Sequence, residues 1–338
     1  MTDLAATDGA ARSTAPRESV EMDCRLEQHR VELTGYCYRM LGSAFEAEDA
    51  VQEALVRAWR NFDRFDEGRA SLGSWLYTIA TNVCFDMLRS TQRRARAMDL
   101  GPSSQAEAPL GVPLHERTWV QPIPDSRVLP AGGDPAELAA QRETIRLAFV
   151  AALQHLPPRQ RAVLILREVL CWKADEVAQL LDTTVASVNS ALQRARSTLA
   201  ARNLTPSEPF QPMDEAQQKL LARYVKAFER HDVDALVSLL HEDATMSMPP
   251  FPWWLCGRAE IRRALLGSGA CHGDRLVPTV ANGSPAFGQY RPSGPEGAHE
   301  PFALLIIEVS GGWITETATY LDAARLFPLF DLPLELGP

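Results

Sequence analysis

Six polar side chains near the middle of the chain are spaced to fall on one side of a helix: Ser187, Asn189, Ser190, Gln193, Arg194 and Arg196. The apolar side chains that recur between them and define the opposite side are Val188, Ala191, Leu192, Ala195 and Leu199. Ser, Asn and Gln side chains can hydrogen-bond to base edges in the major groove of DNA, and Arg side chains bind phosphates or guanine. This combination favours the recognition of double-stranded DNA.

Two further helices are predicted immediately before this one. Pro157-Pro158 favours a helix start, and a recurring apolar face follows it. A second helix is expected over Ala174–Leu181, and the polar residues 182–184 separate it from the helix that begins at Val185. Two short helices around a tight turn, the second polar and basic on its outer side, are typical of a helix-turn-helix. Patterning alone leaves open an ordinary three-helix core with solvated charges.

The charge of the chain is unevenly distributed. Its formal net charge is −9, yet residues 157–202 hold seven Arg or Lys against four acidic residues. In residues 213–338 the balance reverses to ten Arg or Lys against sixteen Asp or Glu, a net charge of −6. Because nucleic acid attracts cationic surfaces, DNA binding is expected in the first of these stretches and not in the second.

A strong resemblance to region four of the sigma-70 family of transcription initiation factors is carried by the run LPPRQRAVLILREVLCWKADEVAQLLDTTVASVNSALQRAR. The similarity is greatest to the small extracytoplasmic-function (ECF, group 4) type. It implies a domain over residues 137–204 that contacts the beta flap of RNA polymerase and reads the minus-thirty-five promoter element with Val185–Arg196. By position, the implied contacts with this element are Ser187, Asn189, Ser190, Gln193, Arg194 and Arg196.

Residues 24–96 contain two long helical patterns that differ in charge. The first, from about Glu46 to Phe62, has an alanine-rich apolar side and an exposed side that carries acidic and basic residues. The second, over residues 71–97, begins with aromatic residues and ends in a basic run. Aromatic side chains beside basic ones suit the stacking of unpaired bases and the tracking of a phosphate backbone. A solvated amphipathic helix and an ordinary apolar core are the alternatives.

A resemblance to region two of the same family is carried by two runs, EAEDAVQEALVRAW and SWLYTIATNVCFDMLRSTQRR. The first is similar to the helix that docks on the beta-prime clamp coiled coil of RNA polymerase, and the implied docking residues are Asp49, Gln52 and Glu53. The second is similar to the segment that melts and holds the minus-ten element, in which a flipped-out base lies near the position of Asn82. The minus-ten contacts that it implies are Trp75, Asn82, Arg89, Arg93 and Arg94.

Three segments are predicted to lie outside the folded domains. Residues 1–23 are expected to form a disordered tail, and residues 205–212 a short linker. Residues 97–136 are dense in Pro and Gly and predict an extended, semi-rigid linker. Within it the run WVQPIPD, at 119–125, resembles a short signature of a sigma subgroup that carries an extra C-terminal domain. A plain tether is the alternative interpretation.

Residues 213–338 extend beyond the minimal sigma architecture. Amphipathic helices come first, and an α+β fold with a curved antiparallel sheet is predicted from strands over Leu276–Ala281, Phe302–Val309 and Trp313–Tyr320. The order and spacing resemble the SnoaL-like, nuclear-transport-factor-like cone fold. That fold implies an apolar pocket, whose lining here would be Met246, Met248, Trp253, Trp254, Phe287 and Trp313. His241 and Asp243 form a close polar pair, which we expect to lie on the surface without a catalytic role.

The sequence as a whole predicts a multidomain protein. Two all-α helical sigma domains, residues 24–96 and 137–204, are followed by an α+β SnoaL-like regulatory domain, residues 213–338. The predicted partners are core RNA polymerase and promoter DNA, and the C-terminal domain is expected to pack on the sigma domains or to bind a small ligand. The alternative is a SnoaL-like ligand-binding protein or enzyme with an attached DNA-binding segment. A plain repressor would not need the polymerase-docking helix.

Composition narrows the remaining possibilities. The six cysteines are scattered without metal-ligand spacing, which predicts reduced thiols and no metal site, and we expect no cofactor. No apolar run is long enough to span a bilayer, and the N-terminal residues lack a basic-then-apolar signal pattern. A cytoplasmic location without membrane contact is therefore expected.

Overall fold

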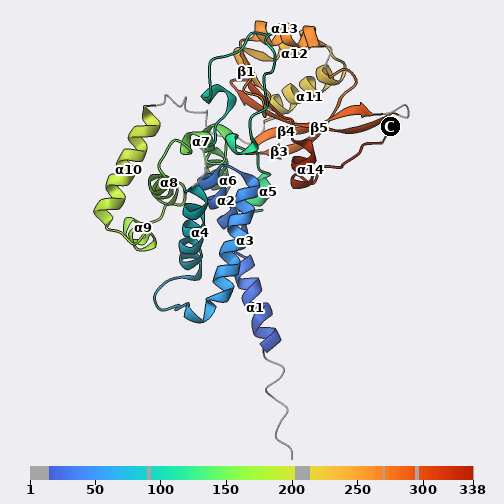
Figure 1. Ribbon diagram of the computed structural model, residues 1–338. Helices are drawn as coiled ribbons and strands as arrows, with labels where there is room; N and C mark the ends of the chain where they lie inside the picture. The colour runs from blue at the N-terminus through green and yellow to red at the C-terminus, as the bar shows by residue number, and fades with distance from the viewer. Residues whose placement is uncertain (1–14, 90–92, 202–213, 269–270, 294–296, 338) are drawn as a thin grey trace, which may run out of the picture.

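The computed structural model describes residues 15–89, 93–201, 214–268, 271–293 and 297–337. It contains a first helical unit (α1–α4), a second helical unit (α6–α10) and a C-terminal domain built on a six-stranded sheet (Figure 1). A connecting segment, residues 95–134, runs between the two helical units. In Figure 1 the C-terminal domain lies above both units, and α2, α5, α6 and α7 lie near the junction of the three parts.

The first helical unit contains α1 (Ala15–Glu27), α2 (Arg30–Leu41), α3 (Ala44–Arg60), a 3₁₀ turn (Phe62–Arg64) and α4 (Leu72–Leu88). Gly42 ends α2 in the left-handed conformation, and Ser43 caps α3 by accepting a hydrogen bond from the N–H of Glu46. The structure shortens two predicted segments. The tail expected over residues 1–23 becomes helical at Ala15, with residues 1–14 outside the described residues, and the helix expected over 71–97 ends at Leu88.

The second helical unit contains α6 (Pro135–Glu143), α7 (Leu147–Leu153), α8 (Pro158–Leu164), a π-helical turn (Ile165–Val169), α9 (Ala174–Leu180) and α10 (Val185–Ala200). A short helix, α5 (Asp125–Val128), precedes it. The sequence predicts one helix over residues 137–154, but the structure divides it because Arg146 adopts an extended conformation (ψ 142°). Helices α9 and α10 form the predicted helix-turn-helix, in which Asp182 turns the chain with a φ of 47° and Thr184 caps α10.

The C-terminal domain contains α11 (Glu215–Glu229), α12 (Val233–Val237), α13 (Arg258–Ser268) and α14 (Ala323–Leu329). Its strands are β1 (Leu240–Ser247), β2 (Trp254–Cys256), β3 (Arg275–Ala281), β4 (Ser284–Ser293), β5 (Ala298–Ser310) and β6 (Trp313–Tyr320), in the spatial order β2-β1-β6-β5-β4-β3. The α+β class is confirmed, but the sheet is mixed because β1 pairs in parallel with β6. These two strands are far apart in the chain, so no hairpin forces them to be antiparallel.

The two faces of this sheet belong to two different cores. Along β5, Leu304 and Ile306 contribute to one core and Leu305 and Ile307 to the other, because side chains alternate along a strand. The core that contains Leu305 is covered by α11, α12 and α13. The core that contains Leu304 includes α14 and continues into the cores of both helical units. The C-terminal domain is therefore packed on the helical units through its own sheet.

The connecting segment is not the extended spacer that its prolines predict. Its first half lies along the C-terminal domain, where the N–H of Ser104 donates to the carbonyl of Trp254 (2.7 Å). Its second half is buried, with Val120 and Ile123 at 1% and 0% exposure. Proline restricts the backbone to an extended conformation but does not decide whether that backbone lies in solvent or against a surface. Here it lies against a surface and holds the three parts together.

Candidate promoter and polymerase interfaces

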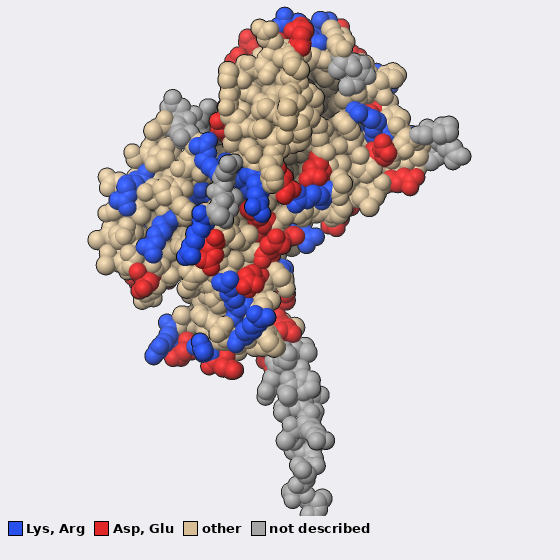
Figure 2. Space-filling view, in the orientation of Figure 1, with Lys and Arg blue, Asp and Glu red and all other residues tan. Residues whose placement is uncertain are grey.

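Helix α10 presents its predicted reading face to solvent. Its apolar side is buried against α8 and α9, while all six predicted contact residues are exposed: Ser187, Asn189, Ser190, Gln193, Arg194 and Arg196. Arg196 forms an ion pair with Glu168, which neutralises part of its charge. Among the described residues no carboxylate pairs with Arg194. The helix lies at the outer edge of the molecule and bears cationic side chains there (Figures 1 and 2).

The predicted docking residues lie on the exposed side of α3. Asp49, Gln52 and Glu53 are three and four residues apart and therefore share one helix face. Glu53 pairs with Arg57 (2.6 Å) on the same helix. Seven residues after Gln52, Trp59 continues this face and is 50% exposed, a residue that the sequence reasoning missed. Its position at helical spacing from Gln52 was the available signal, and exposed tryptophans are characteristic of partner surfaces.

The predicted minus-ten contacts are placed less uniformly. Trp75 is half-buried and its ring stacks on that of Phe65, with ring centroids 5.0 Å apart. Arg93 is exposed and bonds to Nδ1 of His155 (2.7 Å) in the second helical unit. Two further predicted contact residues, Asn82 and Arg89, are exposed. Asn82 lies in α4 and Arg89 directly follows it, and because they are seven residues apart they share one helix face.

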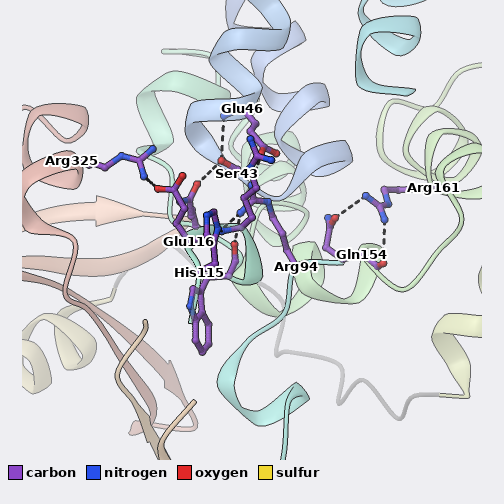
Figure 3. A network of polar contacts seen from close by, with 11 residues as sticks. Ser43, Glu46, Arg94, His115, Glu116, Gln154, Arg161 and Arg325 are labelled. Atoms are coloured by element: carbon purple, nitrogen blue, oxygen red, sulfur yellow. Dashed lines mark hydrogen bonds and ion pairs between the residues drawn. The ribbon is translucent and has the colours of Figure 1, made fainter. Parts of the chain in front are cut away.

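Arg94 does not lie on the surface with them. Its side chain is 3% exposed; it pairs with Glu46 (2.8 Å) and donates to the carbonyl of Trp119 (2.9 Å), contacts that belong to the network in Figure 3. The prediction that Arg94 contacts DNA does not hold in this conformation. Ala95, at the start of the connecting segment, pairs in parallel with Trp119 further along the same segment, and this pairing holds the neighbouring Arg94 in the interior.

Arg94 is one of three arginines buried where the parts of the molecule meet, the others being Arg39 and Arg161. Arg161 in α8 donates to the carbonyl of Met40 in α2 and to Oε1 of Gln154 (2.7 Å), and burial lowers its pKa to about 10. These bonds fasten the second helical unit to the first. They also remove Arg161 from the cationic surplus that the sequence predicts for DNA binding.

The C-terminal domain reaches this junction through the turn between β3 and β4. Asn282 is fully buried, and its side-chain amide donates to the hydroxyl of Tyr38 (2.6 Å) and to the carbonyl of Ile145 (2.6 Å). Its amide oxygen accepts the N–H of Ile123 (3.0 Å). Tyr38 belongs to the first helical unit, Ile145 leads into α7, and Ile123 belongs to the connecting segment. One side chain of the C-terminal domain therefore bonds to all three other parts of the protein.

Ionic contacts surround this bond network. Arg146, ahead of α7, pairs with Glu308 on β5, and Arg96 lies 3.7 Å from Glu316 on β6. Arg325 in α14 pairs with Glu116 of the connecting segment, as Figure 3 shows, and its guanidinium lies 4.2 Å from the centre of the Phe45 ring. The pair of Arg146 joins the C-terminal domain to the second helical unit, and the other two pairs join it to the connecting segment.

Of the six predicted pocket residues, Phe287 alone lines either of two cavities in the described part of the chain. One cavity of about 620 Å³ lies between α11 and the sheet, with Leu221, Val225 and Phe287 in its lining. A second, of about 490 Å³, lies between the connecting segment and the C-terminal domain. Neither cavity is lined by Met246, Trp253, Trp254 or Trp313. Trp313 is 44% exposed at the start of β6, whereas Trp253 is buried in the core beneath α11.

The predicted polar pair of the C-terminal domain lies apart from both cavities. Nδ1 of His241 accepts the backbone N–H of Asp243 (3.2 Å), a contact confined to the outer part of β1. Within the described ranges no cluster of three or more His, Cys, Asp or Glu side chains could hold a metal ion. A search of the same ranges found no helix with the length and apolar character needed to cross a membrane.

Comparison with known protein families separates the chain into the same three parts. Residues 26–94 match the Sigma-70 region 2 family, residues 146–199 match Sigma-70 region 4, and residues 221–317 match the SnoaL-like domain. The fold and the two exposed helical faces therefore belong to a transcription initiation factor with an attached SnoaL-like domain.

Individual relatives identify the family. The chain is 41% identical over 331 residues to the ECF RNA polymerase sigma factor SigG of Mycobacterium tuberculosis, covering 96% of this chain and 88% of SigG. It is 30% identical over 223 residues to SigJ of the same species, covering 66% of this chain and 62% of SigJ. The crystal structure of SigJ superposes with a TM-score of 0.57 and 23% identity over a longer alignment, covering 93% of this chain and 99% of SigJ. The chain belongs to the ECF sigma factor family, whose members bind core RNA polymerase and promoter DNA.

Proposed function

We propose that this sigma factor docks on the beta-prime clamp through the face of α3 that carries Asp49, Gln52 and Glu53, with Trp59 as an apolar anchor. Asn82, Arg89 and Arg93 would contact the minus-ten element beside Trp75, while the second helical unit would bind the beta flap. The minus-thirty-five element would be read by the exposed face of α10. The exposure of these side chains supports each assignment.

We further propose that the free protein is held in a closed, inhibited arrangement. The two promoter elements are named for positions about 25 base pairs apart, which is about 85 Å of duplex at 3.4 Å per base pair. Here the helical units are in direct contact, with the rings of Tyr77 in α4 and Trp172 before α9 only 5.1 Å apart. Helix α4, with its 17 residues, spans only about 26 Å. The units must therefore separate before they can occupy both elements of one promoter.

The position of Asn282 is the observation from which we infer that the C-terminal domain inhibits the sigma factor. Its bonds to Tyr38, Ile123 and Ile145 exist only while the helical units and the connecting segment remain together. A buried amide left without partners costs free energy, so the C-terminal domain stabilises the closed arrangement. Polymerase docking and promoter binding would have to offset that cost.

We propose that the C-terminal domain acts through these contacts and without catalysis. His241 and Asp243 lie outside both cavities, and their one mutual contact is a local backbone bond. A turnover assay in the absence of polymerase would expose an enzymatic role if one existed. The sigma function itself does not depend on the answer.

The test of inhibition is in vitro transcription with bacterial core polymerase, comparing the full-length protein with Asn282→Ala. If the bonds of Asn282 contribute about 1.4 kcal/mol to the closed arrangement, the open fraction and the yield of promoter-specific transcript rise about ten-fold. Val280→Ala is the matched control, because Val280 lies two residues before Asn282 on β3 and is 46% exposed. Circular dichroism of each variant reports whether it is folded.

The proposal of inhibition fails if folded Asn282→Ala transcribes at the wild-type level, or if Val280→Ala raises the yield equally. A fall in transcript from a folded Asn282→Ala would point instead to an activating C-terminal domain. All comparisons use the whole chain, because the core that contains Leu304 continues from the C-terminal domain into the helical units. Removal of the domain would expose that core. A truncated chain could then lose activity by unfolding, and this loss would mask any gain from the release of inhibition.

A further inference from the structure

The cavity of about 490 Å³ has walls from two parts of the molecule. Leu114, Trp119 and Pro122 line it from the connecting segment, and Phe251, Tyr320 and Leu321 line it from the C-terminal domain. Its volume falls in the range of sites for small-molecule ligands. This cavity lies outside the cone of the SnoaL-like domain and differs from the pocket that the sequence predicts.

Hydrogen bonds fix the two walls against each other. The N–H of Leu114 in the connecting segment donates to the carbonyl of Pro250 in the C-terminal domain (2.8 Å), and within that domain the N–H of Leu321 donates to the carbonyl of Pro249 (3.0 Å). The hydroxyl of Tyr320 donates to the carbonyl of Val120 (3.1 Å) in the connecting segment. The cavity is therefore built into the closed arrangement, and it loses one wall if the connecting segment separates from the C-terminal domain.

The lining defines the chemistry of an occupant. Most of the lining side chains are apolar or proline, which favours a compact apolar molecule. Trp119 is 3% exposed and contributes an aromatic side chain to the lining. The charged lining residues are Glu116 and Asp322, and both pair with Arg325. An anionic ligand would meet these carboxylates, whereas a neutral one would not be repelled.

We propose that this cavity binds a small, uncharged, largely apolar molecule, and that its binding inhibits the sigma factor. The coupling rests on the closed arrangement proposed above. A ligand that contacts both walls binds the closed form more tightly than the open form, and it shifts the population towards the closed form by that difference in affinity. The ligand is thus a co-repressor that adds to the contacts of Asn282.

The site is tested first without polymerase, with N-phenyl-1-naphthylamine as a neutral, apolar fluorescent probe. Fluorescence titration of the full-length protein should give one saturable site per chain. Leu321→Trp fills the cavity and should weaken probe binding about ten-fold or more. Leu266→Trp is the matched control, because Leu266 is 54% exposed on α13 and does not line the cavity. Equal probe affinity in both variants would overturn the assignment of the site.

The coupling is tested by in vitro transcription with the same probe. Saturating probe should lower the yield of promoter-specific transcript from wild type and Leu266→Trp, but not from Leu321→Trp. A reaction with a housekeeping sigma factor and the same core polymerase measures direct effects of the probe on the polymerase. A higher yield, or an equal effect on Leu321→Trp, would overturn the proposed co-repressor. Failure of the closed-arrangement proposal is recognised separately, by Asn282→Ala without probe.

Discussion

The two promoter-reading regions of this protein hold their cationic side chains in different ways. On α10, Arg194 stands on an open helix face, and Arg196 has a single exposed partner. After α4, Arg94 is buried in bonds to Glu46 and to the connecting segment, while Arg93 contacts the second helical unit. The minus-thirty-five face is thus available in the closed arrangement, whereas part of the minus-ten segment is used to maintain it.

This difference has a physical origin. The apolar side of α10 packs on α8 and α9 within its own unit. The exposure of its outer side therefore follows from packing inside the second helical unit. Directly after Arg94 the connecting segment begins, and there the N–H of Ala95 donates to the carbonyl of Thr118 in the same segment (2.8 Å). In the proposed closed arrangement, regulation would therefore act on the joint between region 2 and its neighbours and would leave the helix-turn-helix unaltered.

The largest expected effect comes from breaking the joint at Arg161. Arg161→Leu leaves the buried carbonyls of Met40 and Leu156 without donors, at a cost of about 1–3 kcal/mol for each unsatisfied group. We expect the free energy of unfolding to fall by about 3 kcal/mol or more in urea denaturation. Arg159→Leu, on the exposed side of the same helix, should change it by about 0.5 kcal/mol or less. Equal losses in the two variants would mean that Arg161 does not join the units.

The second prediction compares one arginine from each of the two regions, Arg94 and Arg194, in their effects on stability and transcription. Arg94→Ala should lower the free energy of unfolding by about 2–3 kcal/mol, because it leaves the carbonyl of Trp119 without this donor and leaves Glu46 with the more distant Arg117 (3.9 Å). Arg194→Ala should change stability by about 0.5 kcal/mol or less, yet lower promoter-specific transcription about ten-fold through one lost DNA contact. Thermal unfolding and in vitro transcription of both variants make the comparison. If Arg94→Ala is as stable as Arg194→Ala, the contrast between the regions is wrong.

The difference between α10 and the segment that holds Arg94 also explains which features could be predicted from the sequence. The reading face of α10 follows from apolar residues at helical spacing, which is a local property, and the structure exposes every residue that the spacing selects. The sequence RSTQRRARA shows a basic run but cannot show that Arg94 turns inward, because its partners Glu46 and Trp119 lie 48 and 25 residues away. Local periodicity predicts which helix face is polar, and it does not predict which polar groups meet across a junction.

In the C-terminal domain, too, local structure could be predicted from the sequence but contacts between distant segments could not. Asn282-Gly283 is a strong hairpin signal, and it would have added β4 to the predicted strands. The positive φ of Asn282 explains why Asn suits the turn, but its three partners come from distant segments. Likewise, the prolines of the connecting segment predicted an extended backbone but not its burial. The predicted pocket residues other than Phe287 line neither cavity for the same reason, since a cavity between two parts depends on how those parts pack.

The smallest expected effect concerns pH, at the joint between Arg146 and Glu308. Burial raises the pKa of Glu308 above its ordinary value of 4.5, although the guanidinium of Arg146 opposes the shift. The folded state therefore binds this proton more tightly than the unfolded state does. The contribution of Glu308 to stability is full below pH 4.5 and is lost as the pH rises through the folded-state pKa. Glu308→Gln cannot titrate, so its unfolding free energy relative to wild type should increase as the pH rises from 4.5.

Urea denaturation at a series of pH values measures that difference, and Glu300→Gln, exposed on the same strand, serves as the control. A difference between Glu308→Gln and wild type that is constant with pH would show that the pKa of Glu308 is the same in both states. A difference that decreases with pH would mean that Arg146 outweighs burial and that the ion pair stabilises the joint. Because Glu308 belongs to the C-terminal domain and Arg146 leads into the second helical unit, the sign decides whether mild acidification tightens or loosens the closed arrangement.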